Sequence, residues 1–191
     1  MKLFKLFTVL SFSALILITA CGGGRDEKLA KIKDLETRLM QDSLKPKDEV
    51  AAYNLQVAYT EFAELYPKDS LAPVYLYKAA NLSMNLNWGK SAIDILEKFL
   101  TLYPDHKLAS DALFFKGFVF DNQLNDDAKA GECYREFLKK YPTHAFASSA
   151  EASIHNLGKT DEELIREFEK MNSDTSKQAA TTETAAVPAT K

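Results

Sequence analysis

Residues 99–109 read FLTLYPDHKLA, and this stretch decides the fold because its main features occur three times in the chain. The Tyr-Pro pair recurs at spacings of 37 and 38 residues, each time with a Phe five residues before the proline and a Leu-Ala or Phe-Ala pair beginning four residues after it. Self-similarity at a fixed period of this size is typical of a repeat protein. The three pairs are Tyr66-Pro67, Tyr103-Pro104 and Tyr141-Pro142.

The residues between these markers follow a helical period. Apolar residues between positions 93 and 100 recur at i, i+3, i+6 and i+7, which places them on one face of a helix. A proline then ends each helix, because it lacks a backbone N–H. Asn-rich turns at 85–87 and 122–125 divide each unit into two antiparallel helices. We therefore predict helices over 26–43, 49–65, 70–86, 89–102, 107–123, 126–140, 146–156 and 161–171.

The units resemble tetratricopeptide repeats, a family that has small residues where its helices cross closely. Ala92 and Ala130 each lie twelve residues before a repeat proline, at the family's Ala position in the second helix. Ala80 and Gly117 match the family's Gly position in the first helix. The resemblance covers residues 48–158 and implies an all-α fold, a TPR-like superhelix of stacked antiparallel helix pairs.

Phe99 and Phe137 stand where the family usually has Ala. With the ending Phe-Leu-x-x-Tyr-Pro, they resemble the repeats of bacterial envelope lipoproteins and periplasmic factors. Two such groups are the outer-membrane β-barrel assembly lipoproteins and the Tol-Pal-associated cell-division coordinators. The resemblance implies a scaffold that binds envelope proteins or peptides.

Residues 1–20 have the pattern of a lipoprotein signal peptide. Two lysines precede an apolar stretch over 6–18, which is too short to span a bilayer as a helix. Ile-Thr-Ala-Cys at 18–21 resembles the bacterial lipobox, which implies cleavage after residue 20 and acyl chains on Cys21. Gly22 favours the outer membrane, so we expect a lipid-anchored protein that faces the periplasm. The alternative is an ordinary signal peptide followed by a cysteine by chance.

The regions that flank the repeats have different compositions. Residues 21–47 are expected to hold the lipid anchor, a glycine tether and an N-terminal helix. Residues 159–172 predict a capping helix, because stacked repeats need their last apolar face covered. Residues 173–191 contain no aromatic residue and no Leu or Ile, so we expect this tail to be disordered.

Little in the sequence indicates covalent chemistry. The formal net charge of −3 does not favour nucleic-acid binding. Cys133 lies on the apolar stripe of its helix and is expected to be a buried thiol, although it is the one possible handle for an enzyme. The histidines have no cysteine pair or carboxylate cluster with metal-ligand spacing. We therefore predict no catalytic residue, no metal site and no cofactor.

The candidate binding surface follows from the resemblance, because the first helix of each tetratricopeptide unit lines the groove. Asn81 lies where related repeats that clamp a peptide carboxylate have an Asn, but Tyr77 replaces their Lys. An aromatic groove edged by amides and carboxylates suits a peptide with apolar anchors. Two alternatives stay open: the phenylalanines pack between helices, or the aromatic surface binds glycan or peptidoglycan fragments. The candidate residues are Tyr77, Lys78, Asn81, Asn85, Phe114, Phe118, Asp121 and Asn122.

Overall fold

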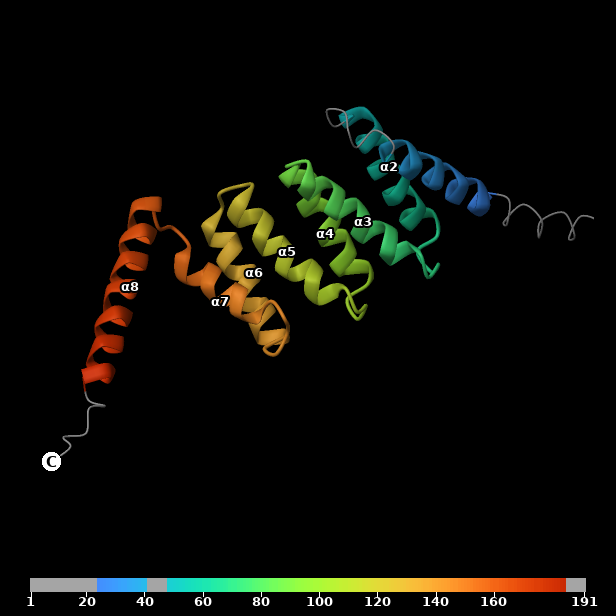
Figure 1. Cartoon of the computed structure of the whole chain (residues 1–191). Helices are drawn as coiled ribbons and strands as arrows, with labels where there is room; N and C mark the ends of the chain where they lie inside the picture. The colour runs from blue at the N-terminus through green and yellow to red at the C-terminus, as the bar shows by residue number, and fades with distance from the viewer. Residues whose placement is uncertain (1–23, 41–47, 185–191) are drawn as a thin grey trace, which may run out of the picture.

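The computed structural model describes residues 24–40 and 48–184, and all the regular structure in these ranges is helical (Figure 1). Each labelled helix from α2 to α7 packs against the next one in the sequence, so that antiparallel pairs stack in chain order. The fold is a TPR-like superhelix, which confirms the predicted fold class. After a helix over residues 24–40, the elements are α2 (Glu49–Leu65), α3 (Ala72–Asn85), α4 (Gly89–Leu102), α5 (Ala109–Asn122), α6 (Asp127–Lys140), α7 (Ala147–Asn156) and α8 (Asp161–Thr184).

The turns within the helix pairs depend on asparagine. Asn87 lies between α3 and α4 with φ 59°, and Asn125 lies between α5 and α6 with φ 51°. This left-handed conformation is costly for most L-residues, but asparagine tolerates it. The two Asn-rich turns predicted from the sequence are therefore where the α3–α4 and α5–α6 pairs reverse direction.

The turns between the pairs share one hydrogen-bonding pattern. The residue three positions after the repeat tyrosine accepts a hydrogen bond from the backbone N–H two residues later, at the start of the next helix. Asp69 accepts through Oδ1 from Leu71 at 2.9 Å. His106 accepts through Nδ1 from Leu108 at 3.2 Å, and His144 accepts in the same way from Phe146 at 3.2 Å. His106 and His144, two of the three histidines, thus accept a hydrogen bond from the backbone at the point where a turn leads into the next helix.

The core is built from the repeat phenylalanines and the small residues. Phe62, Phe99 and Phe137 are fully buried, as are the alanines at the predicted helix crossings. A Cβ added to Gly117 would lie 2.9 Å from two ring carbons of Tyr134, which is also fully buried. Close approach of α5 and α6 at this crossing therefore requires glycine.

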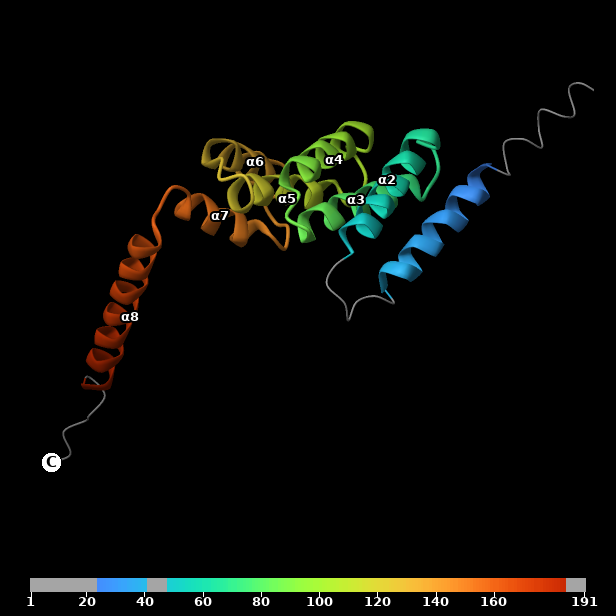
Figure 2. The same cartoon turned by 90° about the horizontal axis from the view of Figure 1, so that it is seen from above.

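The helix over 24–40 belongs to the stack, although the resemblance placed the start of the repeats at residue 48. Arg25 pairs with Asp69 just beyond the end of α2, whereas Glu36 accepts a hydrogen bond from Tyr59 nearer the middle of α2. The helix therefore runs antiparallel to α2, and Ile32 at its centre is 1% exposed (Figure 2). It takes the place of the first helix in a pair with α2.

The C-terminal helix differs from the prediction in length and in position. It extends to Thr184, twelve residues beyond the predicted end at 172, so residues 173–184 are helical rather than disordered. These residues contain good helix formers such as Ala, Lys and Gln, and no proline occurs before Pro188 to stop the helix. The last residues of the predicted tail, 185–191, lie outside the described residues.

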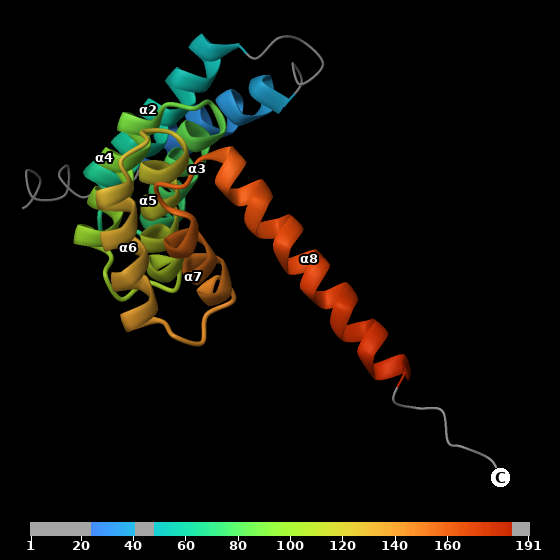
Figure 3. The same ribbon diagram turned by 90° about the vertical axis from the view of Figure 1, so that its left-hand side faces the viewer.

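The same helix does not cover the end of the stack. It leads away from α7, and Ile165, Phe168 and Met171 on its apolar stripe are 57%, 64% and 68% exposed (Figure 3). Leu164 stands at the fourth position of α8, where α4 and α6 have a buried alanine. His155 stands at the ninth position of α7, where α3 and α5 have Ala or Gly. The positions that are small where the other helix pairs cross are thus bulky in α7 and α8, and His155 Nε2 lies 3.4 Å from Glu167 of α8.

Candidate functional site

The first helices of successive pairs lie side by side and carry the predicted binding residues. Glu36 in the helix over 24–40 pairs with Lys78 of α3. Gln123, at the end of α5, donates to the backbone oxygen of Met84 in α3 at 2.9 Å. Phe114 of α5 stacks on Phe146 at the start of α7, with ring centroids 4.6 Å apart. Among the described residues, two hollows lie beside these helices, one toward each end of the stack.

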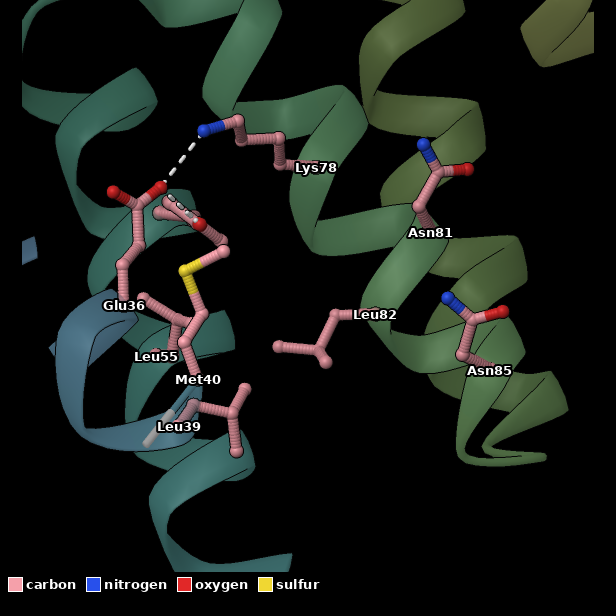
Figure 4. A pocket seen from close by; sticks show the side chains of 9 residues that line it. Glu36, Leu39, Met40, Leu55, Lys78, Asn81, Leu82 and Asn85 are labelled. Atoms are coloured by element: carbon pink, nitrogen blue, oxygen red, sulfur yellow. Dashed lines mark hydrogen bonds and ion pairs between the residues drawn. The ribbon is translucent and has the colours of Figure 1, made fainter. Parts of the chain in front are cut away.

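The N-terminal hollow lies between the helix over 24–40, α2 and α3, and it has a volume of about 420 Å³ (Figure 4). Its wall is mostly apolar, and α3 adds two amides, Asn81 and Asn85, one helical turn apart. Three of the predicted residues meet here. The lining consists of Glu36, Leu39, Met40, Leu55, Tyr59, Lys78, Asn81, Leu82 and Asn85.

A fixed group of charges forms one side of this hollow. Glu36 accepts from Lys78 Nζ at 2.7 Å and from the Tyr59 hydroxyl at 2.6 Å. Burial alone would raise the pKa of Glu36, but these two hydrogen bonds hold it below its ordinary value. Lys78 also lies 5.7 Å and 5.6 Å from the ring centroids of Tyr59 and Tyr75, within the range of a cation–π contact. These contacts together fix the orientation of the Lys78 side chain.

The C-terminal hollow lies between α5, α7 and the start of α8, and its volume is about 650 Å³. It contains Phe118, Asp121 and Asn122 from the predicted set, and its surface is more polar than that of the N-terminal hollow. Phe118 is 37% exposed. Burial raises the pKa of Asp121, although the Tyr134 hydroxyl donates to this carboxylate at 3.2 Å.

Two of the predicted residues pack inside the fold instead of lining a hollow. Phe114 is 7% exposed and contacts the rings of Tyr134 and Phe137, as expected from the alternative in which the phenylalanines pack between helices. Three phenylalanines within five residues cannot share one side of a helix, and Phe114 faces α6. Tyr77 is half-buried with its ring 5.9 Å from that of Phe99, and burial raises the pKa of Tyr77 to about 12.

The helix over 24–40 contributes residues to the N-terminal hollow that are not among the predicted site residues. Glu36, Leu39 and Met40 precede the region of family resemblance. A signal for this helix did exist, since Leu29, Ile32, Leu35 and Leu39 follow a helical period. It indicated an apolar face but not the neighbour that the face would contact.

The described residues offer neither an activated thiol nor a cluster of metal ligands. Cys133 is buried, and burial raises the pKa of its thiol. Within residues 24–40 and 48–184, no group of three or more His, Cys, Asp or Glu side chains could hold a metal ion. None of the helices in these ranges is both long enough and apolar enough to cross a membrane. The predicted lipidation site, Cys21, lies outside the described residues.

This geometry defines a class of protein, a helical repeat in which hollows lie beside the first helices of the pairs. The sequence profile of the tetratricopeptide repeat matches residues 111–144, which cover nearly all of α5 and all of α6. No curated protein is significantly similar to the chain. The chain thus contains a tetratricopeptide repeat within a TPR-like superhelix, and such repeats are typically non-catalytic scaffolds for protein–protein interaction.

Proposed function

We propose that this protein is a lipid-anchored scaffold of the bacterial cell envelope that binds a protein partner in the N-terminal hollow. The observation that carries the proposal is the pair of amides, Asn81 and Asn85, beside an apolar wall. Asparagine side chains can both donate to and accept from a peptide backbone, and an apolar wall accommodates one anchoring side chain. The function is binding and positioning, without covalent chemistry.

The envelope setting rests on the sequence. A signal peptide over 1–20 and acyl chains on Cys21 would place the protein at the outer membrane, with its repeats in the periplasm. The likeness of the repeats to those of assembly lipoproteins and division coordinators favours a role in outer-membrane assembly or in envelope and division coordination. The partner is then an envelope protein or one of its extended segments.

The binding proposal is tested with a display library of random peptides. We expect the selected peptides to share one large apolar residue. In fluorescence anisotropy, the double variant Asn81→Ala with Asn85→Ala should weaken their binding by about thirtyfold, because two hydrogen bonds of about 1 kcal/mol each are lost. Asn54→Ala is the matched control, because Asn54 is an exposed amide on α2 outside the hollow.

The outcome separates the proposal from its alternative. Equal binding by the double variant and the control would exclude the N-terminal hollow as the peptide site. If peptidoglycan fragments raise the melting temperature and no peptide is selected, the glycan-binding alternative replaces the proposal.

The anchor is tested in cells. Cys21→Ser should release the protein from the membrane fraction or leave an uncut precursor. A processed protein that stays in the membrane fraction after this substitution would contradict lipidation at Cys21.

A further inference from the structure

The turns that join successive helix pairs all lie along one edge of the stack, which we call the turn edge. It consists of residues 24–28, 64–71, 101–108 and 139–146 (lower side of Figure 1). The Tyr103 hydroxyl donates to the Pro67 oxygen at 3.1 Å, which joins two of these turns directly. Arg25 Nε lies 2.6 Å from Asp69 Oδ2, so the start of the helix over 24–40 belongs to the same edge.

The turn edge combines exposed apolar and basic side chains. Leu65 and Leu102 are the last residues of α2 and α4, and they are 54% and 45% exposed. Lys68 and Lys107 follow them in the turns and are also exposed, as is Lys140 at the end of α6. Leucines flanked by lysines suit the boundary between lipid headgroups and acyl chains, where a lysine can reach phosphate.

Acidic groups on this edge are largely neutralised by neighbours. Asp69 is paired with Arg25, and Glu64 is paired with Lys98. The pairing of Arg25 lowers the pKa of Asp69, which therefore stays ionised and matched. Asp26 lies 3.4 Å from the same Arg25. Two further acids of the turn edge, Glu27 and Asp105, are exposed. They are balanced by the exposed lysines Lys68, Lys107 and Lys140.

The opposite edge has a different character. Its turns hold the exposed amides Asn87 and Asn125, followed by Asp126 and Asp127 at the start of α6. The opposite edge also exposes apolar side chains, Met40 by 76% and Val50 by 70%, so the edges differ mainly in their turns: exposed lysines lie in those of the turn edge, and amides and aspartates in those of the opposite edge.

The short segment between Cys21 and the first described helix indicates which surface the turn edge contacts. Cys21 precedes Gly24 by three residues, which span about 10 Å at most when extended. Gly24 is already helical, and a Cβ on it would lie 3.2 Å from the Tyr66 hydroxyl. A lipid on Cys21 would therefore bring the turn edge to the bilayer, instead of letting the repeats stand far from it.

We propose that the turn edge rests on the membrane surface, with Leu65 and Leu102 in the interface and Lys68 and Lys107 near lipid phosphates. This inference rests on the proposed lipidation of Cys21. The helix over 24–40 and α3 then point away from the bilayer. Asn85, the last residue of α3, lies about 20 Å farther out than the turn edge, so the N-terminal hollow faces a partner above the membrane.

Hydrogen–deuterium exchange on the full-length lipidated protein tests this orientation. The protein is compared in detergent and in vesicles of phosphatidylethanolamine and phosphatidylglycerol. We expect slower exchange in vesicles for peptides that cover 64–71 and 101–108. Peptides that cover 86–89 and 123–127, on the opposite edge, should exchange equally in both. Protection of the opposite edge, or of neither edge, would overturn the orientation.

Paired variants identify the side chains responsible. Leu65→Ser with Leu102→Ser should reduce the protection of both turns, whereas Val50→Ser with Val57→Ser should not. Val50 and Val57 are exposed by 70% and 40% on α2 but lie away from the turn edge. Equal effects of the two pairs would contradict a specific membrane contact.

The mass of the N-terminal peptide separates the two proposals. If Cys21 carries acyl chains and the turns are unprotected, only the orientation fails. If Cys21 carries none, the anchor fails and the orientation fails with it. Protection that depends on an added envelope protein rather than on vesicles would assign the turn edge to a protein partner and overturn the lipid contact.

Discussion

At the scale of single residues, one position in each inter-pair turn accepts the same backbone hydrogen bond through either an aspartate or a histidine side chain. Asp69, His106 and His144 each accept a backbone hydrogen bond at the start of the following helix. His106 and His144 also pack edge-on against the repeat phenylalanines Phe99 and Phe137. The sequence places both histidines in equivalent turns, but spacing alone cannot reveal that their Nδ1 atoms act as acceptors.

Exchanging the acceptor tests this capping role. His106→Ala should lower the free energy of unfolding by about 1 kcal/mol more than His106→Asp, because the aspartate can replace the acceptor as Asp69 does in its own turn. Urea denaturation of the two variants gives the comparison. Equal losses for Ala and Asp would show that packing on Phe99, and not the cap, is what the histidine contributes.

The left-handed asparagines give a second test at this scale. Asn125→Ala should cost about 1 kcal/mol of unfolding free energy, since alanine is strained at positive φ. Asn125→Gly should cost less, because glycine adopts this conformation without strain. A glycine variant that is as unstable as the alanine variant would indicate that the asparagine side chain, not its backbone, is required.

At the scale of helices, the pairs that pack closely have small residues where the two helices cross. Gly117 lets α5 approach Tyr134 of α6, whereas α7 and α8, which have His155 and Leu164 at the matching positions, do not pack along their length. The six repeat helices α2 to α7 and the turns between them could be predicted from the Tyr-Pro period, because local patterns specify them. The divergence of α8 could not be predicted, because the pattern of its first turns indicates an apolar face but not which neighbour covers that face.

A methyl group added at the α5–α6 crossing should lower the free energy of unfolding. Gly117→Ala places its Cβ 2.9 Å from the Tyr134 ring, which is fully buried and cannot move into solvent. We expect a loss of about 1–3 kcal/mol in urea unfolding, the usual cost of overpacking. Ser148→Ala on the exposed face of α7 serves as the control. A loss no larger than that of the control would contradict the required close approach.

The docking of the helix over 24–40 should depend on pH through Glu36. Its pKa is lowered in the folded protein, so its ion pair stabilises the fold above the ordinary Glu pKa of about 4.3. That contribution is lost as pH falls through the lowered value. Glu36→Gln should therefore be less stable than wild type at neutral pH, and the difference should vanish in acid. A difference that is independent of pH would exclude the carboxylate as its source.

At the scale of the whole molecule, the stack has two chemically different sides. The first helices of the pairs form a face with an apolar, amide-bearing hollow, and the inter-pair turns form an edge with protruding leucines. The sequence predicted Lys78, Asn81 and Asn85 for the binding face. It could not predict that residues 36–40 complete the same hollow, because those residues lie outside the repeats and reach α3 only through folding.

The measurement that tests the central claim most directly is site-specific photo-crosslinking in living cells. A photoreactive amino acid is placed at position 81 or 85 in the N-terminal hollow, or at position 54 on the outside of α2. A scaffold that holds a protein partner in this hollow should give a discrete adduct with one envelope protein from positions 81 and 85 and none from position 54. Equal labelling from position 54, or no adduct from the hollow, would contradict the proposed function.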